Sequence, residues 1–408
     1  MKDKLGKFEI LINPDGTKSF KTDPNIPDDV EKLGKFLTDN KETLKELIGT
    51  QTQQPVQSAP AHHSGEFGAT FESVLKKYED RRKDEVASKT VYQYGLNIRK
   101  FLAWSEDRAG YKPLIMYQID RRFIAQYVEY LRKNGVGNLT IENKHMRPLN
   151  TIFDFASSIG EFPDIEAPSR GHRLKATKQD KNSKIPRKPF GDDDLKKIFN
   201  PATYLQIKHP DGFWLPLLSL YTGARLNELC KLAYFDIGET DGVHWIHINE
   251  DNGSLKNEAS HRKTPLHPQL IELGFLDYVA DLKKWGGMLF PHLKPDAHGS
   301  YIKNPSRRFG EYLDKIGMTD KGLVFHSFRS TVSDLLKQSG VPAEERDDFI
   351  GHEHNTVDAK HYTQKFQPKY LAEKVAPHLI YDLDLSPLRY TKDRFERFLR
   401  QNLKKRDG

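Results

Sequence analysis

The chain has 408 residues, a single cysteine and a formal net charge of +7, from 64 Lys and Arg against 57 Asp and Glu. This length leaves room for two or three domains with hydrophobic cores of their own. The mean hydropathy is −0.71, and no apolar run approaches the roughly 18–20 residues that cross a bilayer, which argues against a membrane protein. One cysteine excludes internal disulfide bonds and suits a reducing cytoplasm. The basic balance is compatible with an anionic partner.

Residues 1–62 are predicted to form a small β-hairpin and helix followed by a linker. Residues 8–21 contain two β-forming runs around an Asp-Gly turn, and an amphipathic helix is expected over residues 30–48. The linker that follows, residues 49–65, is rich in Gln, Pro, Ala and Ser. With 9 Lys and no Arg against 10 acidic residues, this region is predicted to serve docking or assembly. Binding of a DNA arm is the alternative.

Residues 63–165 are predicted to be all helical. Apolar side chains recur three and four positions apart, which predicts four to five short helices. Pro148 lies inside the helix expected over residues 141–156, so a kink or an interruption is expected there. Residues 166–189 form a linker with eight basic against two acidic residues. Its net charge of +6 is well placed to lie along phosphates.

Residues 190–385 combine helices with a short sheet. An apolar helix over residues 213–221 is expected to end at Gly223, and the next helix to begin at Arg225 and to bury Cys230. Between residues 238 and 265, β-forming runs on either side of an Asp-Asn-Gly-Ser turn predict an antiparallel hairpin.

Residues 322–366 hold a set of side chains suited to phosphate chemistry. His326 and Arg329 are three positions apart and therefore share a helix face. A second helix is expected to end at Gly351, so His352 follows a helix end, and Tyr362 falls in a third helix. Arginine clamps phosphate with two donors, histidine donates or moves a proton, and a deprotonated tyrosine can attack phosphorus.

The order His326-Ser-Phe-Arg329, then Gly351-His352, then Tyr362 resembles that of the tyrosine recombinase family, which includes the phage integrases. A second motif supports the resemblance, since Thr222-Gly-Ala-Arg225-Leu-Asn-Glu228-Leu229 matches the family pattern around its first arginine. The resemblance covers about residues 190–381 and, more loosely, the hundred residues before them.

The resemblance implies a mostly α fold with a small antiparallel β-sheet (α+β). A helical core-DNA-binding domain (63–165) and a catalytic domain (190–385) would form a clamp around DNA. The implied function is a site-specific recombinase that integrates or excises a phage or a genomic island through a 3′-phosphotyrosine intermediate. It would use no metal, ATP or cofactor, and would act as a homotetramer on synapsed double-stranded attachment sites. A nucleoid-associated location in the cytoplasm is implied, with a host DNA-bending protein and an excisionase as open further partners.

The residues that the resemblance assigns to catalysis are Arg225, Lys256, His326, Arg329, His352 and the nucleophile Tyr362. The two arginines would clamp the non-bridging oxygens of the scissile phosphate, and Tyr362 would attack in line. Glu228, one turn after Arg225, is expected to orient that arginine.

The other three residues would handle protons. Lys256 would protonate the leaving 5′ oxygen, His326 would assist proton transfer at the nucleophile, and His352 would donate to a phosphate oxygen. Lys263, inside the second strand of the hairpin, is the weaker candidate for the lysine.

Two departures from the family pattern affect the assignment. Ser330 follows Arg329 where many members have a histidine, and the interval of ten residues from His352 to Tyr362 is one longer than is most usual. Tyr370 and Tyr381 are therefore the alternative nucleophiles.

A metal site is an alternative use of the histidines and the aspartate in this region. His352, His354, Asp358 and His361 are close in sequence, but their spacing matches no metalloenzyme pattern such as His-Glu-x-x-His. No metal site is predicted. A Xer-like chromosome-dimer resolvase, a type IB topoisomerase and a catalytically silent DNA-binding protein are the alternative functions.

Residues 386–408 are predicted to form a basic amphipathic tail helix. They carry eight basic against three acidic residues and an apolar stripe at helical spacing, formed by Phe395, Phe398, Leu399 and Leu403. The combination predicts that the helix docks on an adjacent protomer, with packing on its own domain as the alternative.

Overall fold

The computed structural model describes residues 9–12, 18–21, 68–83, 88–110, 113–172, 174–175, 177, 185–250, 260–353 and 365–403. Near the N-terminus, β1 (Glu9–Ile12) and β2 (Lys18–Lys21) pair antiparallel, with Glu9 opposite Lys21. The helix expected over residues 30–48 lies outside the described residues. None of the helices within the described ranges has the length and apolarity that a bilayer crossing demands.

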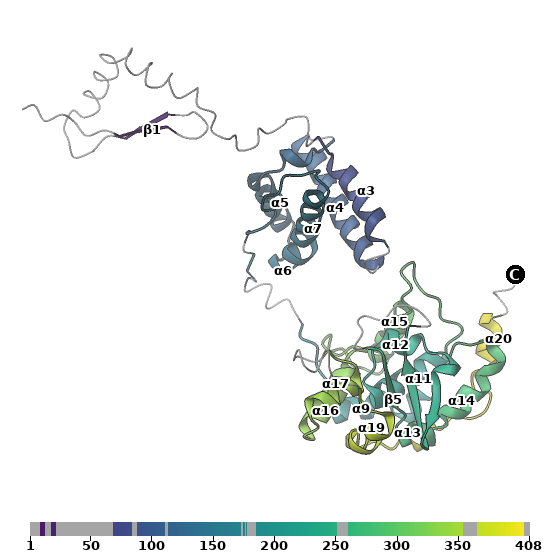
Figure 1. Ribbon diagram of the computed structural model, residues 1–408. Helices are drawn as coiled ribbons and strands as arrows, with labels where there is room; N and C mark the ends of the chain where they lie inside the picture. Colours follow the sequence, from purple (N-terminus) through teal and green to yellow (C-terminus); the bar gives the residue numbers. More distant parts are fainter. Residues whose placement is uncertain are drawn as a thin grey trace, which may run out of the picture.

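The helical region that follows the N-terminal linker has a hydrophobic core of its own, built from residues between Phe71 and Leu174 (Figure 1). Its elements are α3 (Phe71–Arg82), α4 (Ser88–Ala109), η2 (Met116–Gln118), α5 (Arg121–Lys133), α6 (Asn138–Ile141), η3 (Glu142–Met146) and α7 (Arg147–Ser158). Capping side chains set two of the helix starts, because Thr70 accepts from the Ser73 amide and Asp120 from the Phe123 amide.

Pro148 interrupts the long helix expected over residues 141–156. The backbone passes from α6 through a π-helical segment, η3, and Pro148 then stands in the first turn of α7, where its missing N–H costs little. The predicted interruption is therefore confirmed, and the apolar side chains on both sides of it still face one core.

The larger body has a second core, formed by residues between Phe190 and Leu399. Its first half comprises α9 (Asp192–Ile198), α10 (Pro201–Tyr204), α11 (Pro210–Thr222), α12 (Leu226–Cys230), η4 (Tyr234–Asp236), β3 (Ile237–Thr240), β4 (Val243–Ile248) and β5 (Arg262–Pro265). Its second half comprises α13 (Pro268–Glu272), α14 (Phe275–Leu282), η6 (Lys283–Trp285), α15 (Lys303–Lys315), α16 (Ser327–Gln338), α17 (Ala343–Ile350), α19 (Pro368–Lys374), η7 (Ala376–His378), η8 (Ser386–Leu388) and α20 (Glu396–Leu403).

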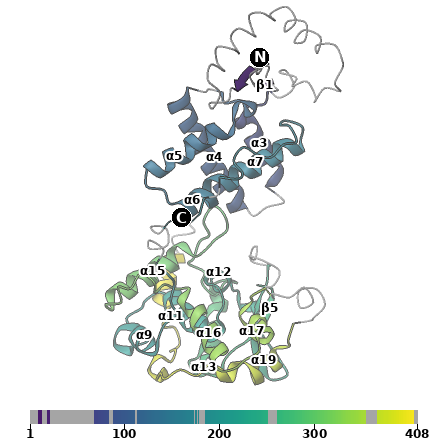
Figure 2. The ribbon, with the colours of Figure 1, turned by 90° about the vertical axis from the view of Figure 1, so that its left-hand side faces the viewer.

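Helix α11 is the centre of this body. It is apolar on all sides and buried along nearly its whole length, as expected for a helix surrounded by others, and it packs against α16. Strands β3, β4 and β5 form an antiparallel sheet in that order, with Trp245 opposite Pro265 and Ile248 opposite Arg262. The predicted mostly α fold with a small antiparallel sheet is confirmed. Figure 2 shows β5, α12 and α17 near one another in this body, and α17 contacts β5.

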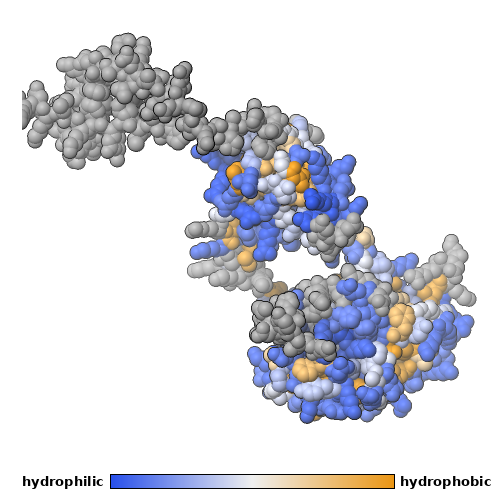
Figure 3. Space-filling view, viewed as in Figure 1, coloured by the Kyte–Doolittle hydropathy of each residue, from blue (hydrophilic) through white to orange (hydrophobic). Residues whose placement is uncertain are grey.

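The tail helix packs on its own domain. Phe395 and Leu399 are each 2% exposed and belong to the core of the larger body, and Phe398 lies against the rings of His209 and His292. The predicted docking on an adjacent protomer is therefore wrong for this structure, because the apolar stripe is already covered within the chain. The coloured part of the surface in Figure 3 is mostly hydrophilic, with separate apolar patches.

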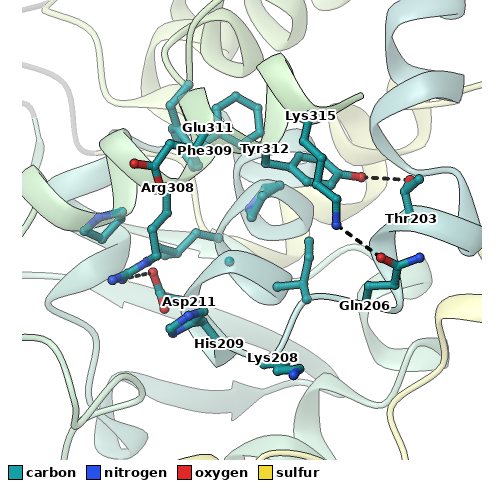
Figure 4. A pocket seen from close by; sticks show the side chains of 16 residues that line it. Thr203, Gln206, Lys208, His209, Asp211, Arg308, Phe309, Glu311, Tyr312 and Lys315 are labelled. Atoms are coloured by element: carbon teal, nitrogen blue, oxygen red, sulfur yellow. Dashed lines mark hydrogen bonds and ion pairs between the residues drawn. The ribbon is translucent and has the colours of Figure 1, made fainter. Parts of the chain in front are cut away.

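A cavity of about 350 Å³ lies between the α10–α11 region and α15 (Figure 4). Asp211, one of the polar residues that line the cavity, is buried and accepts hydrogen bonds from Arg308 and from His292. Lys315 donates to Gln206 at the opposite end. The ion pair between Arg308 and Asp211 thus joins α15 to α11.

Truncation of the tail-helix anchor tests the cis packing. Phe395→Ala should destabilise the larger body by ~3–5 kcal/mol, because it removes a fully buried ring. Arg397→Ala, at an exposed position two residues further along, should change stability by less than about 0.5 kcal/mol. Urea denaturation of the full chain measures both. Equal, small effects would show that the helix is not anchored in its own domain.

Candidate active site

Arg225 stands at the start of α12 and is held by Glu228. The Glu228 carboxylate accepts from the Arg225 amide at 2.9 Å and from its Nη1 at 2.7 Å, and Nη1 also lies 2.8 Å from Ser260 Oγ. The Arg225 side chain is 19% exposed, whereas that of Glu228 is 5% exposed. The predicted orienting role of Glu228 is confirmed. The arginine is therefore fixed at its inner edge and open to solvent at its outer edge.

Gly223 makes the approach to Arg225 possible. Its φ is +60°, which favours glycine, and it ends α11. A Cβ at this position would lie 2.7 Å from Ile350 Cγ2 and 3.1 Å from Val332 Cγ1. The absence of a side chain therefore lets the loop before Arg225 pack directly on α16 and α17.

Arg329 is buried in α16, with 3% of its surface exposed. Its Nη1 donates to the carbonyl oxygens of Gly223 and Ile350, and its Nη2 donates to Gly351 O at 3.0 Å. Main-chain oxygens are thus partners of both terminal nitrogens of this guanidinium group. Burial, with Arg225 and Arg262 nearby, lowers the pKa of Arg329 to about 9, so the group stays charged at pH 7.

His352 begins where α17 ends. Gly351 has a φ of +73° and its amide, like that of His352, donates to Asp347 O. His352 Nε2 accepts from Arg329 Nε at 3.2 Å, and Nδ1 lies 3.5 Å from Asp347 Oδ1. This arrangement places the ring proton on Nδ1, facing Asp347. His352 thus contacts Arg329 through Nε2, and its donation to a phosphate oxygen remains a prediction.

His326 lies directly before α16 and is exposed. Its position one turn before Arg329 places the two residues on the same side of α16, as predicted. Arg225, His326, Arg329 and His352 therefore lie on α12, α16 and the end of α17, and the Gly223 carbonyl links the first arginine to the second.

Lys256 and Tyr362 fall in residues 251–259 and 354–364, outside the described residues, so their assignments remain predictions. The ends of these two segments lie side by side, because Lys365 Nζ donates to the His261 carbonyl. One segment reaches Ser260, which contacts Arg225, and the other leaves from His352 and Glu353. Ser260 and His352, which lie next to these segments in sequence, therefore both contact the arginine cluster.

The alternative nucleophiles have other contacts. The Tyr381 hydroxyl donates to Leu220 O at 2.8 Å, and burial raises the pKa of Tyr381 well above its ordinary value. Tyr370 donates to Glu345, and that hydrogen bond raises the pKa of Tyr370. Both contacts disfavour the phenolate that an attack on phosphorus requires. Lys263, the weaker lysine candidate, lies over the Trp245 ring at 4.2 Å.

Arg262 is part of the cluster and was not singled out by the sequence. It is 3% exposed, and its Nη2 lies 3.2 Å from Glu228 Oε2. The sequence signal that could have found Arg262 is the alternation of inward and outward side chains along a strand. In β5, Arg262 and Thr264 are buried and Lys263 is exposed. In the part of the chain that the structure describes, no cluster of three metal-ligating side chains occurs.

The environment of His352 gives a testable pKa. Burial, followed by the charges of Arg329, Arg225, Arg262 and Arg346, lowers the pKa of His352 to about 4. The ring should therefore be neutral from pH 5 upward and gain a proton only as the pH falls through about 4. An NMR titration of the imidazole, assigned by loss of the signal in His352→Gln, measures this value. A midpoint near 6.5 would contradict the contact with Arg329.

Comparison with known proteins agrees with this geometry. Residues 191–368 match the model of the phage integrase family. The chain is similar in structure to a lambda integrase tetramer bound to a Holliday junction, with a TM-score of 0.50, 17% identity, and coverage of 85% of this chain and 94% of that chain. It is also similar to the Tn1549 transposon integrase in complex with circular intermediate DNA, with a TM-score of 0.51, 16% identity, and coverage of 74% and 98%.

No curated protein sequence matches the chain. At these identities the two structural likenesses show the fold. The family match covers a segment that contains Arg225, Arg329, both histidines and the predicted tyrosine. Residues 191–368 therefore match the phage integrase family in sequence, and the chain shares the fold of the integrases.

Proposed function

We propose that this protein is a site-specific DNA recombinase, an integrase of a phage or a genomic island, that cuts and rejoins DNA through a 3′-phosphotyrosine. The observation that carries the proposal is the pair of arginines, Arg225 and Arg329, which are fixed by buried partners. Ser260 contacts Arg225 and follows residues 251–259 in sequence, which include Lys256. His352 contacts Arg329 and precedes residues 354–364, which include Tyr362. Donors that are already oriented stabilise the charge of a five-coordinate phosphorus without further reorganisation.

The reaction assigned to the site is a transesterification. Tyr362 Oη attacks phosphorus, forming a bond to the 3′ phosphate, while the bond to the 5′ oxygen breaks and Lys256 supplies its proton. Arg225 and Arg329 bind the non-bridging oxygens, and His326 assists the proton that leaves the tyrosine. His352 holds Arg329 through Nε2. Because the new ester retains the bond energy, reversal of the same step rejoins the strand without ATP.

The wider arrangement supports DNA as the partner. The helical body (63–165) and the larger body (190–385) are proposed to close on a double helix, with the basic linker 166–189 along the phosphates. The solved relatives are a tetramer on a Holliday junction and an integrase on circular intermediate DNA. We propose a homotetramer on synapsed attachment sites for this chain too. Residues 1–62, with their net charge of −1, are assigned to docking or assembly.

Removal of the attacking oxygen tests the reaction. Tyr362→Phe should bind DNA like the native chain but form no covalent adduct, because the ring is kept and the nucleophile is lost. Denaturing electrophoresis after incubation with fragmented DNA of the source organism detects the adduct, and sequencing of the held end locates the cut. Tyr370→Phe is the matched control and should form the adduct normally. An adduct in Tyr362→Phe would assign the nucleophile to another tyrosine.

Replacement of the first clamp tests the role of guanidinium geometry. Arg225→Lys keeps the charge, but an ammonium cannot bind Glu228, Ser260 and a phosphate oxygen in one fixed plane. Adduct formation should slow by roughly a hundredfold, the size of one transition-state contact of about 3 kcal/mol. Single-turnover rates at saturating DNA measure the loss. A rate close to that of the native chain would make Arg225 a structural residue.

A further inference from the structure

Arg262 shares Glu228 with Arg225 and contacts the end of α17, which also holds Arg329. On β5 its side chain points inward, and its Nη2 shares the Glu228 carboxylate with Arg225. Its Nε donates to Phe349 O at 3.1 Å, and its Nη1 donates to Ser260 O at 2.9 Å. All three nitrogens of the guanidinium group thus contact the protein, and the side chain is 2% exposed. Arg262 is therefore not open to a substrate in this structure.

The end of α17 is held by two arginines in succession. Carbonyl groups at a helix C-terminus lack partners within the helix and carry partial negative charge. The Phe349 carbonyl accepts from Arg262 and from Thr264, and the next two carbonyls accept from Arg329. A Cβ on Gly351 would lie 2.3 Å from Arg262 Nη1, so the helix end and Arg262 are in direct contact. A shift of Arg262 would move the peptide groups that hold Arg329.

Arg262 also alters the charge balance at Arg225. The carboxylate of Glu228 is buried and lies against two guanidinium groups. Burial raises the pKa of Glu228, but Arg262 and Arg225 more than offset this effect and keep the pKa below its usual range. If Glu228 faced a single arginine, its negative charge would neutralise the charge of that arginine. With two arginines a net positive charge remains. Arg225 is the more exposed of the two and can therefore present this charge to a phosphate.

We propose that Arg262 is a positioning residue of the recombinase site that acts as the counter-ion of Glu228. It leaves the charge of Arg225 available to the scissile phosphate, and it anchors the end of α17 that holds Arg329. This inference rests on the proposed function for its kinetic consequence. Its electrostatic part concerns the protein alone.

The kinetic test uses a pair of variants. Arg262→Gln leaves Glu228 to neutralise Arg225, and the single-turnover rate of adduct formation at saturating DNA should fall at least about tenfold, with little change in DNA affinity. In Arg262→Gln/Glu228→Gln the competing charge is gone, while the side-chain amide oxygen that replaces the carboxylate can still accept from Arg225. The double variant should therefore react faster than Arg262→Gln alone. Arg400→Gln, an exposed arginine on α20, is the control and should react like the native chain.

The outcomes separate a charge effect from simple loss of structure. If the double variant is as slow as Arg262→Gln or slower, Arg262 acts through packing and the counter-ion role is wrong. If Arg262→Gln reacts at the native rate, the inference as a whole is wrong. Thermal unfolding of each variant identifies any loss of folded protein, and Arg262→Lys, which retains the charge, should recover part of the rate if the fold is intact.

A second readout needs no catalysis. The charge of Arg262 is one of the causes that lower the pKa of His352. The NMR titration of His352 should therefore move to higher pH in Arg262→Gln and return towards lower pH in the double variant. An unchanged midpoint in Arg262→Gln would overturn the electrostatic role. If the native chain forms no adduct with any DNA, the proposed function fails, and the His352 titration still decides whether Arg262 sets the charge of this cluster.

Discussion

The site depends on the burial of positive charge. Arg225, Arg262 and Arg329 gather around one carboxylate, that of Glu228, and around the carbonyl oxygens at the end of α17. Buried guanidinium groups are costly unless their donors are satisfied, and removal of one partner from such a cluster typically costs ~3–5 kcal/mol. The cluster therefore holds its geometry before any anion arrives, which is the condition for electrostatic stabilisation of a transition state.

The same constraint explains features of the backbone around the site. Gly223 and Gly351 both have positive φ, and each lies where a side chain would collide with the packed cluster. Thr264 and Arg262 alternate inward on β5 because the strand must supply both donors to the end of α17. Strand β5, the loop at Gly223 and the end of α17 thus all pack against the arginine cluster. The core beneath them, centred on α11, is apolar and provides the rigid support.

The tail helix illustrates how burial competes with charge in deciding where a segment lies. Its net charge suggests contact with DNA or another protomer, yet Phe395 and Leu399 enter the core of the larger body. Burial of two large apolar side chains contributes roughly 3–6 kcal/mol, whereas exposed basic groups contribute little to folding. Arg397 and Arg400 of the helix remain exposed and can still face a partner.

Local patterns in the sequence were enough to predict the helical and strand content, the interruption at Pro148, and the roles of Glu228 and Gly223, since each depends on neighbouring residues. The family resemblance named Arg225, Arg329 and His352, which the structure brings together, and His326, which it places at the start of α16. Only the tertiary structure placed Arg262 in the cluster, turned His352 towards Arg329, and packed the tail in cis. These three depend on contacts between residues more than 20 positions apart. Periodicity and motif spacing describe what a segment can bury or donate, but which partner it meets is decided when distant segments compete for the same buried space.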